Sequence, residues 1–335
     1  FQSTGEGGLS PYHRHGADLI FQIGTGYFGC RNRAGDFDLN RLCETIEGAP
    51  VRAIEIKLSQ GAKPGLGGIL PAAKVTKEIA DIRGATMGVD CISPPRHSAF
   101  GNVDELLDFA EVIAQRTGLP VGIKSAVGQT DFWRDLAAHM QDGQRGLDFI
   151  TIDGGEGGTG AAPLAFADHV SLPLKIGFAR AYSEFARLGI ADNVVWVASG
   201  KLGFPAASLM AFALGADMIN VGREAMLAIG CIQSQRCHTD RCPTGVTTHI
   251  RWRAAGLDPE LKSHRLANYV VTLRGELLAL SRTAGAPHPA LVSAEAVELV
   301  DEHFGARTLR EVFRYERSWG IPPAERAAEI AALIP

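Results

Sequence analysis

Three of the six cysteines in this 335-residue chain lie within one short stretch, at Cys231, Cys237 and Cys242. Their spacing is C-x5-C-x4-C, and Pro243 follows directly. Thiolates gathered in one loop select soft metals, so this run predicts an iron–sulfur cluster or zinc. Three ligands suit a three-iron, four-sulfur (3Fe-4S) cluster, in which each iron takes one cysteine. The alternatives are a zinc site completed by His238, which lacks the usual C-x2-C spacing, and three buried cysteines without a metal.

Glycines gather in three loops, each directly after an apolar stretch. The chemistry-bearing residues of these loops are Asp153, Gly154, Gly155, Gly158, Thr159, Gly200, Gly222 and Arg223. Glycine lets the backbone approach a flat ring or a phosphate, and it exposes main-chain N–H groups as donors. Arg223 adds a guanidinium suited to a phosphate. One such loop alone is typical of an ordinary turn, whereas three loops after successive strands indicate a binding site.

Basic side chains accompany these loops. Lys124 lies near the end of the apolar segment 120–126, where a cation is suited to stabilise negative charge on a bound flavin ring. The alternative is a lysine that extends from a strand end into solvent. Lys57, Lys63 and Arg83 supply charge for a carboxylate substrate, although each of them alone is typical of ordinary surface charge.

Short Val- and Ile-rich stretches alternate with amphipathic segments, which predicts repeated β-loop-α units. The predicted strands are 19–24, 53–58, 88–92, 120–126, 148–153, 193–198 and 218–222. The predicted helices between them are 72–83, 103–117, 131–142, 174–188 and 204–214. This alternation favours an α/β fold of the (β/α)8 TIM-barrel type, with its first strand missing from this chain. A doubly wound sheet is disfavoured because no G-x-G-x-x-G follows the strand 19–24.

The pattern changes near residue 250. The later segments 263–284, 293–304 and 323–333 read as helices. We therefore expect a barrel over residues 1–250, which includes the cysteine loop 231–242, and a helical extension over residues 251–335 that packs on it.

Composition narrows the class of protein. With 46% hydrophobic and 21% charged residues, the chain is able to bury a sizeable core. The 33 Lys and Arg against 37 Asp and Glu leave a net charge of -4, so no nucleic-acid partner is expected. No long apolar span or leader is visible, which favours a cytoplasmic location; a membrane anchor upstream of Phe1 stays open.

Taken together, these stretches resemble the FMN-binding domain of the glutamate synthase family, over about Thr4 to Thr248. The matching segments are Thr4-Gly-Glu-Gly-Gly8, Gln60-Gly-Ala-Lys-Pro-Gly65, Ile92-Ser-Pro-Pro95, the glycine run from Asp153 to Pro163, and Gly230-Cys231 through Cys242-Pro243 to Gly245-Val246. The resemblance implies an FMN-binding TIM barrel with a 3Fe-4S cluster that feeds the flavin. It also implies an oxidoreductase in which reduced FMN reduces the imine of 2-oxoglutarate and ammonia to glutamate.

The resemblance also assigns residues by position. Cys231, Cys237 and Cys242 would hold the cluster, and Glu6, Lys63 and Arg83 would handle the substrate. The expected FMN-binding residues are Gln22, Lys124, Asp153, Gly154, Gly155, Gly158, Thr159, Gly200, Gly222 and Arg223.

Two departures from the family pattern leave the substrate open among 2-oxo acids and amino acids. Leu66 and Ile69 stand where the family has an acidic residue and an amide that helps to bind 2-oxoglutarate. The alternatives are amine transfer, as in N-methylglutamate synthases, and a non-catalytic redox subunit.

The expected partners follow from the same resemblance. The amidotransferase domain of the family has no counterpart in this sequence, so a separate glutaminase subunit or free ammonia is expected. A ferredoxin or a reductase subunit is the expected electron donor. Four arginines beside the cysteines favour an acidic donor, although a solvated basic loop explains them equally well. They are Arg236, Arg241, Arg251 and Arg253.

Overall fold

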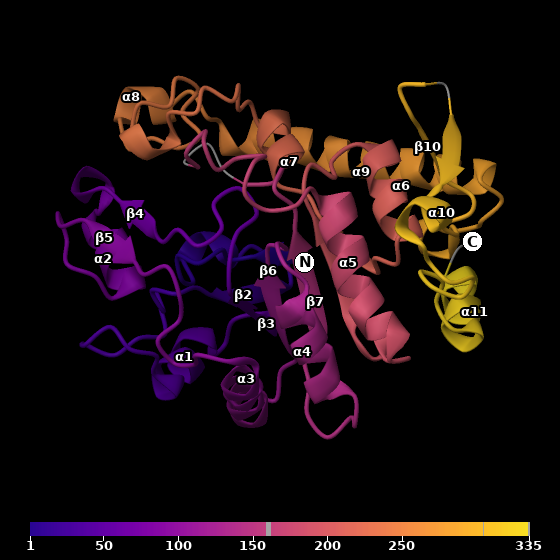
Figure 1. Ribbon diagram of the computed structural model, residues 1–335. Helices are drawn as coiled ribbons and strands as arrows, with labels where there is room; N and C mark the ends of the chain where they lie inside the picture. The colour runs from indigo at the N-terminus through magenta and orange to yellow at the C-terminus, as the bar shows by residue number, and fades with distance from the viewer. Residues whose placement is uncertain (159–161, 304, 334–335) are drawn as a thin grey trace.

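Seven parallel strands form the main sheet, and they follow one another in chain order (Figure 1). The computed structural model describes residues 1–158, 162–303 and 305–333. The strands are β1 (Gln2–Ser3), β2 (Leu19–Ile23), β3 (Val51–Lys57), β6 (Val121–Ser125), β7 (Phe149–Asp153), β8 (Val195–Ser199) and β9 (Met218–Asn220). Each pairs in parallel with its neighbour, and β1 and β9 form the two edges. The predicted α/β class and barrel order are confirmed, with seven strands of a barrel present in the described residues.

Helices connect these strands and cover the sheet. They are α1 (Leu39–Ile46), α2 (Lys77–Arg83), α3 (Val103–Thr117), α4 (Asp131–Met140), α5 (Leu174–Arg187), α6 (Pro205–Ala213), α7 (Arg223–Ala228), α8 (Arg251–Ala254), α9 (Pro259–Thr283), α10 (Leu309–Phe313) and α11 (Ala324–Ala332). Local sequence explains their ends: Asn102 caps the first turn of α3, and Gly118 ends that helix in a left-handed conformation. The helix predicted over 103–117 is confirmed residue for residue.

The core lies between the sheet and the helices. All five residues of β7 are buried, as expected for a parallel strand covered on both faces. Trp133 of α4 and Trp196 of β8 are among the largest fully buried side chains. Leu273 and Leu277 of α9 belong to the same core, so the C-terminal region shares the apolar interior of the sheet.

Two predicted elements are wrong. The segment 88–92 is not a strand of the main sheet; Cys91–Ser93 forms β5, which pairs antiparallel with β4 (Gly68–Leu70) in a separate hairpin. The predicted helix 293–304 is replaced by β10 (Glu298–Val300), which pairs antiparallel with β11 (Ala306–Thr308). Exposure alternates along β10, which is the period of a strand rather than of a helix.

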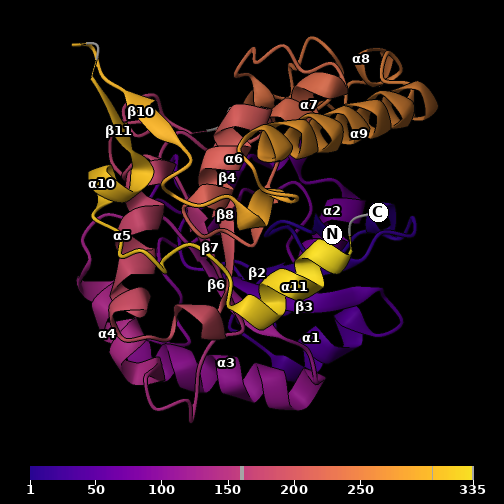
Figure 2. The ribbon, with the colours of Figure 1, turned by 90° about the vertical axis from the view of Figure 1, so that its right-hand side faces the viewer.

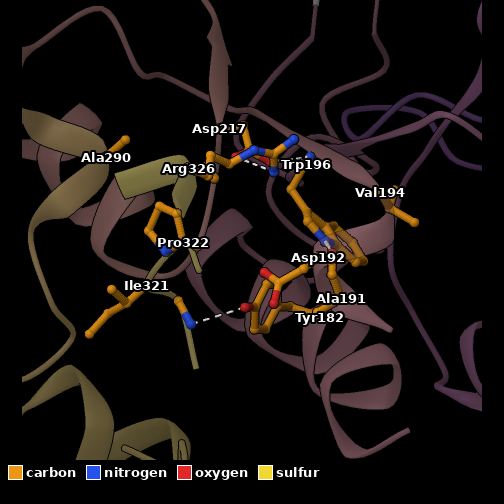
Figure 3. Close-up of a pocket in the computed structure, with 13 residues that line it drawn as sticks. Tyr182, Ala191, Asp192, Val194, Trp196, Asp217, Ala290, Ile321, Pro322 and Arg326 are labelled. Carbon is orange, nitrogen blue, oxygen red and sulfur yellow. Dashed lines mark hydrogen bonds and ion pairs between the residues drawn. The ribbon is translucent and has the colours of Figure 1, made fainter. Parts of the chain in front are cut away.

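The C-terminal segment is fixed to the sheet by polar contacts as well as by its core residues. Figure 2 shows α11 in front of the sheet. Figure 3 shows the anchoring contacts around a small cavity of about 20 Å³: Arg326 of α11 reaches Asp217 at 3.8 Å, and the main-chain N–H of Gly320 donates to the Tyr182 hydroxyl at 2.9 Å. Among the described residues, no helix has both the length and the apolar character needed to cross a bilayer.

Candidate active site

A cavity of about 1240 Å³ lies at the carboxyl ends of the parallel strands. The predicted residues that line it are Gln22, Lys124, Asp153, Gly158, Gly200, Gly222 and Arg223. Parallel strands bring their carboxyl ends to the same side of a sheet, which explains why residues so far apart in sequence meet here. The opposite wall is formed by α9, through residues such as Tyr269 and Leu273.

A buried carboxylate organises the floor of this cavity. Glu55 of β3 is 4% exposed, and its two oxygens accept hydrogen bonds from Gln22 Nε2 at 2.5 Å and from the Thr151 hydroxyl at 2.7 Å. Gln22 is thereby fixed by a partner that the sequence patterns do not single out. A lone acidic residue inside the apolar run of β3 is the signal that would have identified Glu55.

The buried Asp153 and the partly buried Lys124 form a charged pair. The Asp153 carboxylate accepts hydrogen bonds from the Ser199 hydroxyl at 2.8 Å and from the main-chain N–H of Gly61 at 2.9 Å. Lys124 Nζ lies 3.7 Å from Asp153 Oδ2. Burial works to lower the pKa of Lys124, but Asp153 and Glu55 raise that pKa above its ordinary value. The cavity therefore holds a permanent cation.

The glycines of the loop after β7 serve two purposes, close packing and lining of the cavity. A Cβ on Gly154 would lie 2.6 Å from the main-chain nitrogen of Leu174, so this glycine is required by packing. Gly157 and Gly158 line the cavity, and a Cβ on Gly158 would also overlap that of Ala62. Arg223 Nη2 donates to the carbonyl of Glu156 at 3.2 Å, which brings the guanidinium to this loop.

Of the two remaining predicted residues of this loop, the structure describes one. Gly155 packs as Gly154 does, because its Cβ would lie 2.7 Å from the carbonyl oxygen of Ser171. Thr159 lies outside the described residues.

Gly61 closes the site from the side of β3, and we predict that Gly61→Ala destabilises the protein. Its Cβ would overlap the carbonyl oxygen of Gly154, which is backbone and unable to rotate away. We expect the free energy of unfolding to fall by about 1–3 kcal/mol, measured by urea denaturation. The control is Gly128→Ala, because nothing lies within 4 Å of its Cβ position. Equal stability of the two variants would contradict the prediction.

A charged cluster lies beside the cavity and contains the three predicted substrate residues. Glu6 Oε2 is 3.0 Å from Lys57 Nζ, which also donates to Gln60 Oε1 at 3.1 Å. Gln60 lines the cavity and so joins the cluster to it. Burial works to raise the pKa of Glu6, but Lys57, Lys63 and Arg83 hold that pKa below its ordinary value.

Contacts with neighbouring residues show where the Lys63 and Arg83 side chains lie. A Cβ on Gly68 would lie 3.6 Å from Glu6 Oε1 and 3.7 Å from Lys63 Nζ, so both charges face this glycine. The Arg83 guanidinium lies 4.8 Å from the centre of the buried Phe28 ring, a cation–π contact that fixes its direction.

Ile69, one of the two departures from the family pattern, points away from this cluster. Successive residues of a strand face opposite sides, and Gly68 faces the cluster. Ile69 is 65% exposed, as is expected for a side chain on the outer face of the hairpin. Leu66, the other departure, is 40% exposed.

The charge on Glu6 gives a pH prediction. Its pKa is lowered in the folded state, so its stabilising effect is complete above the ordinary value of 4.5 and is lost as the pH falls through the folded pKa. We expect Glu6→Gln to cost about 1.5–3 kcal/mol at pH 7 and progressively less below pH 4.5. Urea denaturation across this range measures the difference. The exposed Glu44→Gln is the control, and a constant cost at all pH values would refute the assignment.

The cysteine loop lies at the same end of the sheet, after α7. The three thiols are free; Cys231 and Cys237 are half-buried and Cys242 is buried. Burial works to raise the pKa of Cys242, but hydrogen bonds from Thr244 and from the backbone of Thr247 lower it to about 6. Three free thiols, one of which has a lowered pKa, fit iron–sulfur chemistry. In the described residues, however, no group of three or more His, Cys, Asp or Glu side chains is placed to hold a metal ion. The 3Fe-4S cluster therefore stays a prediction.

Fold and cavity define an α/β protein with a ligand-sized site at the carboxyl ends of parallel strands. The family model described as "Conserved region in glutamate synthase" matches residues 1–287. The chain belongs to the glutamate synthase family.

Curated relatives extend this finding. The glutamate synthase large subunit-like protein YerD of Bacillus subtilis is 42% identical over 89% of this chain and 57% of its own length. An archaeal glutamate synthase (NADPH) of Methanocaldococcus jannaschii is 35% identical over 85% of this chain and 53% of its own length. The chain thus spans about half the length of these relatives. A solved structure of a flavocytochrome b2 variant with sulfite bound matches with a TM-score of 0.48 and 14% identity, over 93% of this chain and 59% of that one.

Proposed function

We propose that this chain is an FMN-dependent oxidoreductase of the glutamate synthase type, which reduces the imine of a 2-oxo acid. The observation that carries the proposal is a cavity whose lining includes the basic side chains of Lys124 and Arg223 and glycine-rich loops, beside a cluster able to bind a carboxylate. When bound, FMN supplies hydride transfer. Arg223 and the glycine N–H groups would bind the phosphate, and Lys124 would stabilise negative charge at the ring.

The charged cluster would bind and protonate the substrate. Lys63 and Arg83 supply positive charge for its carboxylate. Burial lowers the pKa of Lys57, despite the opposing effect of Glu6, which makes its ammonium a better proton donor near neutral pH. We propose that Lys57 Nζ holds a proton for the reaction and that Glu6 orients it.

The cysteine loop enters the proposal through its donor chemistry. A 3Fe-4S cluster held by Cys231, Cys237 and Cys242 would be the route by which an external donor supplies electrons. Arg236 and Arg241 on this loop are exposed, which favours an acidic donor protein. Ammonia would come from a separate subunit or from solution.

Anaerobic reoxidation tests the function. The protein is loaded with FMN and iron, reduced, and mixed with 2-oxoglutarate and ammonium, with glutamate and methylamine, or with buffer. We expect flavin reoxidation and glutamate formation only in the first mixture. Turnover confined to the second mixture would favour amine transfer, and equal rates in all three would favour a non-catalytic subunit. Failure to bind FMN would overturn the proposal.

A further inference from the structure

A buried lysine, Lys74, links the cysteine loop to the segment of chain that follows Lys63. Lys74 ends the short 3-10 helix Ala72–Lys74, eleven residues after Lys63, and it is 8% exposed. Its Nζ donates to the main-chain carbonyl of Cys237 at 2.8 Å and to that of Thr247 at 3.1 Å. These partners lie 163 and 173 residues further along the chain, so the contacts are long-range.

The two carbonyls belong to opposite arms of the loop, and Cys242 lies between them in the sequence. A second set of contacts joins the same arms: the Thr248 hydroxyl donates to the carbonyl of Asp240 at 2.6 Å, and the main-chain N–H of His249 donates to Asp240 Oδ1 at 2.8 Å. Lys74 differs from these contacts because it reaches the loop from another part of the fold.

The loop needs such an external support. Gln233, Gln235 and Asp240 all have positive φ, which is costly for residues other than glycine. Its internal hydrogen bonds, such as that from the Thr239 hydroxyl to the carbonyl of Arg236, join residues of the same loop, and its only regular element is the three-residue 3-10 helix Cys237–Thr239. An ammonium group that donates to two carbonyls forms charge-assisted hydrogen bonds, which are stronger than neutral ones.

We propose that Lys74 is a positioning residue, which holds the two arms of the cysteine loop together. The proposal concerns the iron-free protein and does not rest on the proposed function.

Thiol reactivity in the iron-free protein tests whether Lys74 holds the loop. We expect Lys74→Met to raise the alkylation rate of Cys242, followed by peptide mass spectrometry, by about tenfold or more, because one lost charge-assisted hydrogen bond shifts a local opening equilibrium by that factor. Lys74→Arg should restore most of the protection. Lys77→Met is the matched control, because Lys77 lies three residues away with its side chain 81% exposed.

Unchanged alkylation rates in Lys74→Met would overturn the proposal, as would equal effects of Lys74→Met and Lys77→Met. Should Lys74→Met not fold, Lys74→Gln, which retains a donor, is measured in its place.

Discussion

Replacing Asp153 with alanine is expected to lower the free energy of unfolding by about 3–5 kcal/mol, because it removes the nearer of the two carboxylates that stabilise the largely buried Lys124 ammonium. The Asp153 side chain is 3% exposed and lies 3.7 Å from Lys124 Nζ. Its loss also leaves the Ser199 hydroxyl and the main-chain N–H of Gly61 without their acceptors. Urea denaturation measures the change.

A double-mutant cycle separates the ion pair from the hydrogen bonds. In Asp153→Ala/Lys124→Met, the buried ammonium is removed together with its partner, so we expect a cost that is about 0.5–3 kcal/mol smaller than the sum of the two single variants. The control is Asp18→Ala, because Asp18 pairs with Arg52 at 2.8 Å but its side chain is 50% exposed. Its cost should stay below about 1 kcal/mol. Strict additivity in the cycle would show that the pair contributes nothing.

Replacing Arg223 with alanine is expected to weaken FMN binding by about 10–100-fold, which corresponds to one lost hydrogen bond to a charged group. Arg223 lines the cavity and lies against the glycine-rich loop through the Glu156 carbonyl, so its charge is directed at the expected phosphate position. Titration of apoprotein by the quenching of flavin fluorescence measures the affinity.

Riboflavin, which lacks the phosphate, is the control ligand. Its affinity should be the same in the wild type and in Arg223→Ala, since the only ligand contact expected of Arg223 is to the phosphate. The exposed Arg180 provides the control variant Arg180→Ala, which should change neither affinity. Equal losses for riboflavin and FMN in Arg223→Ala would show that the arginine supports the cavity rather than the phosphate.

The elements that the sequence predicts correctly are those with long, regular patterns. Buried parallel strands appear as continuous apolar runs, and α3 carries both of its caps in the sequence. β1 is only two residues long, which is too short for any periodicity to register. The segment 88–92 is apolar enough for a strand, but its pairing with β4 depends on tertiary contacts that no local pattern encodes.

The candidate site shows the same limits. Residues at strand ends were predictable, because a parallel sheet brings those ends together whatever lies between them. The direction of a side chain was not: Ile69 occupies the expected position in the sequence but faces away from Glu6 and Lys63. The contacts of Lys74 were not predictable either. Its Nζ donates to the main-chain carbonyls of Cys237 and Thr247, and a lysine that follows a hairpin gives no sign of such distant partners.

The shared interior of the sheet and the C-terminal region determines how the molecule melts. Tyr269 donates to the Gly203 carbonyl at 2.7 Å, and the Tyr315 hydroxyl donates to the carbonyl of Leu214, so both tyrosines join the C-terminal region to the segment that contains α6. We therefore expect the regions before and after residue 250 to unfold together on heating, in one cooperative transition that includes the first strands and α11. A substitution that destabilises the C-terminal helices would then remove the cavity by unfolding the whole protein.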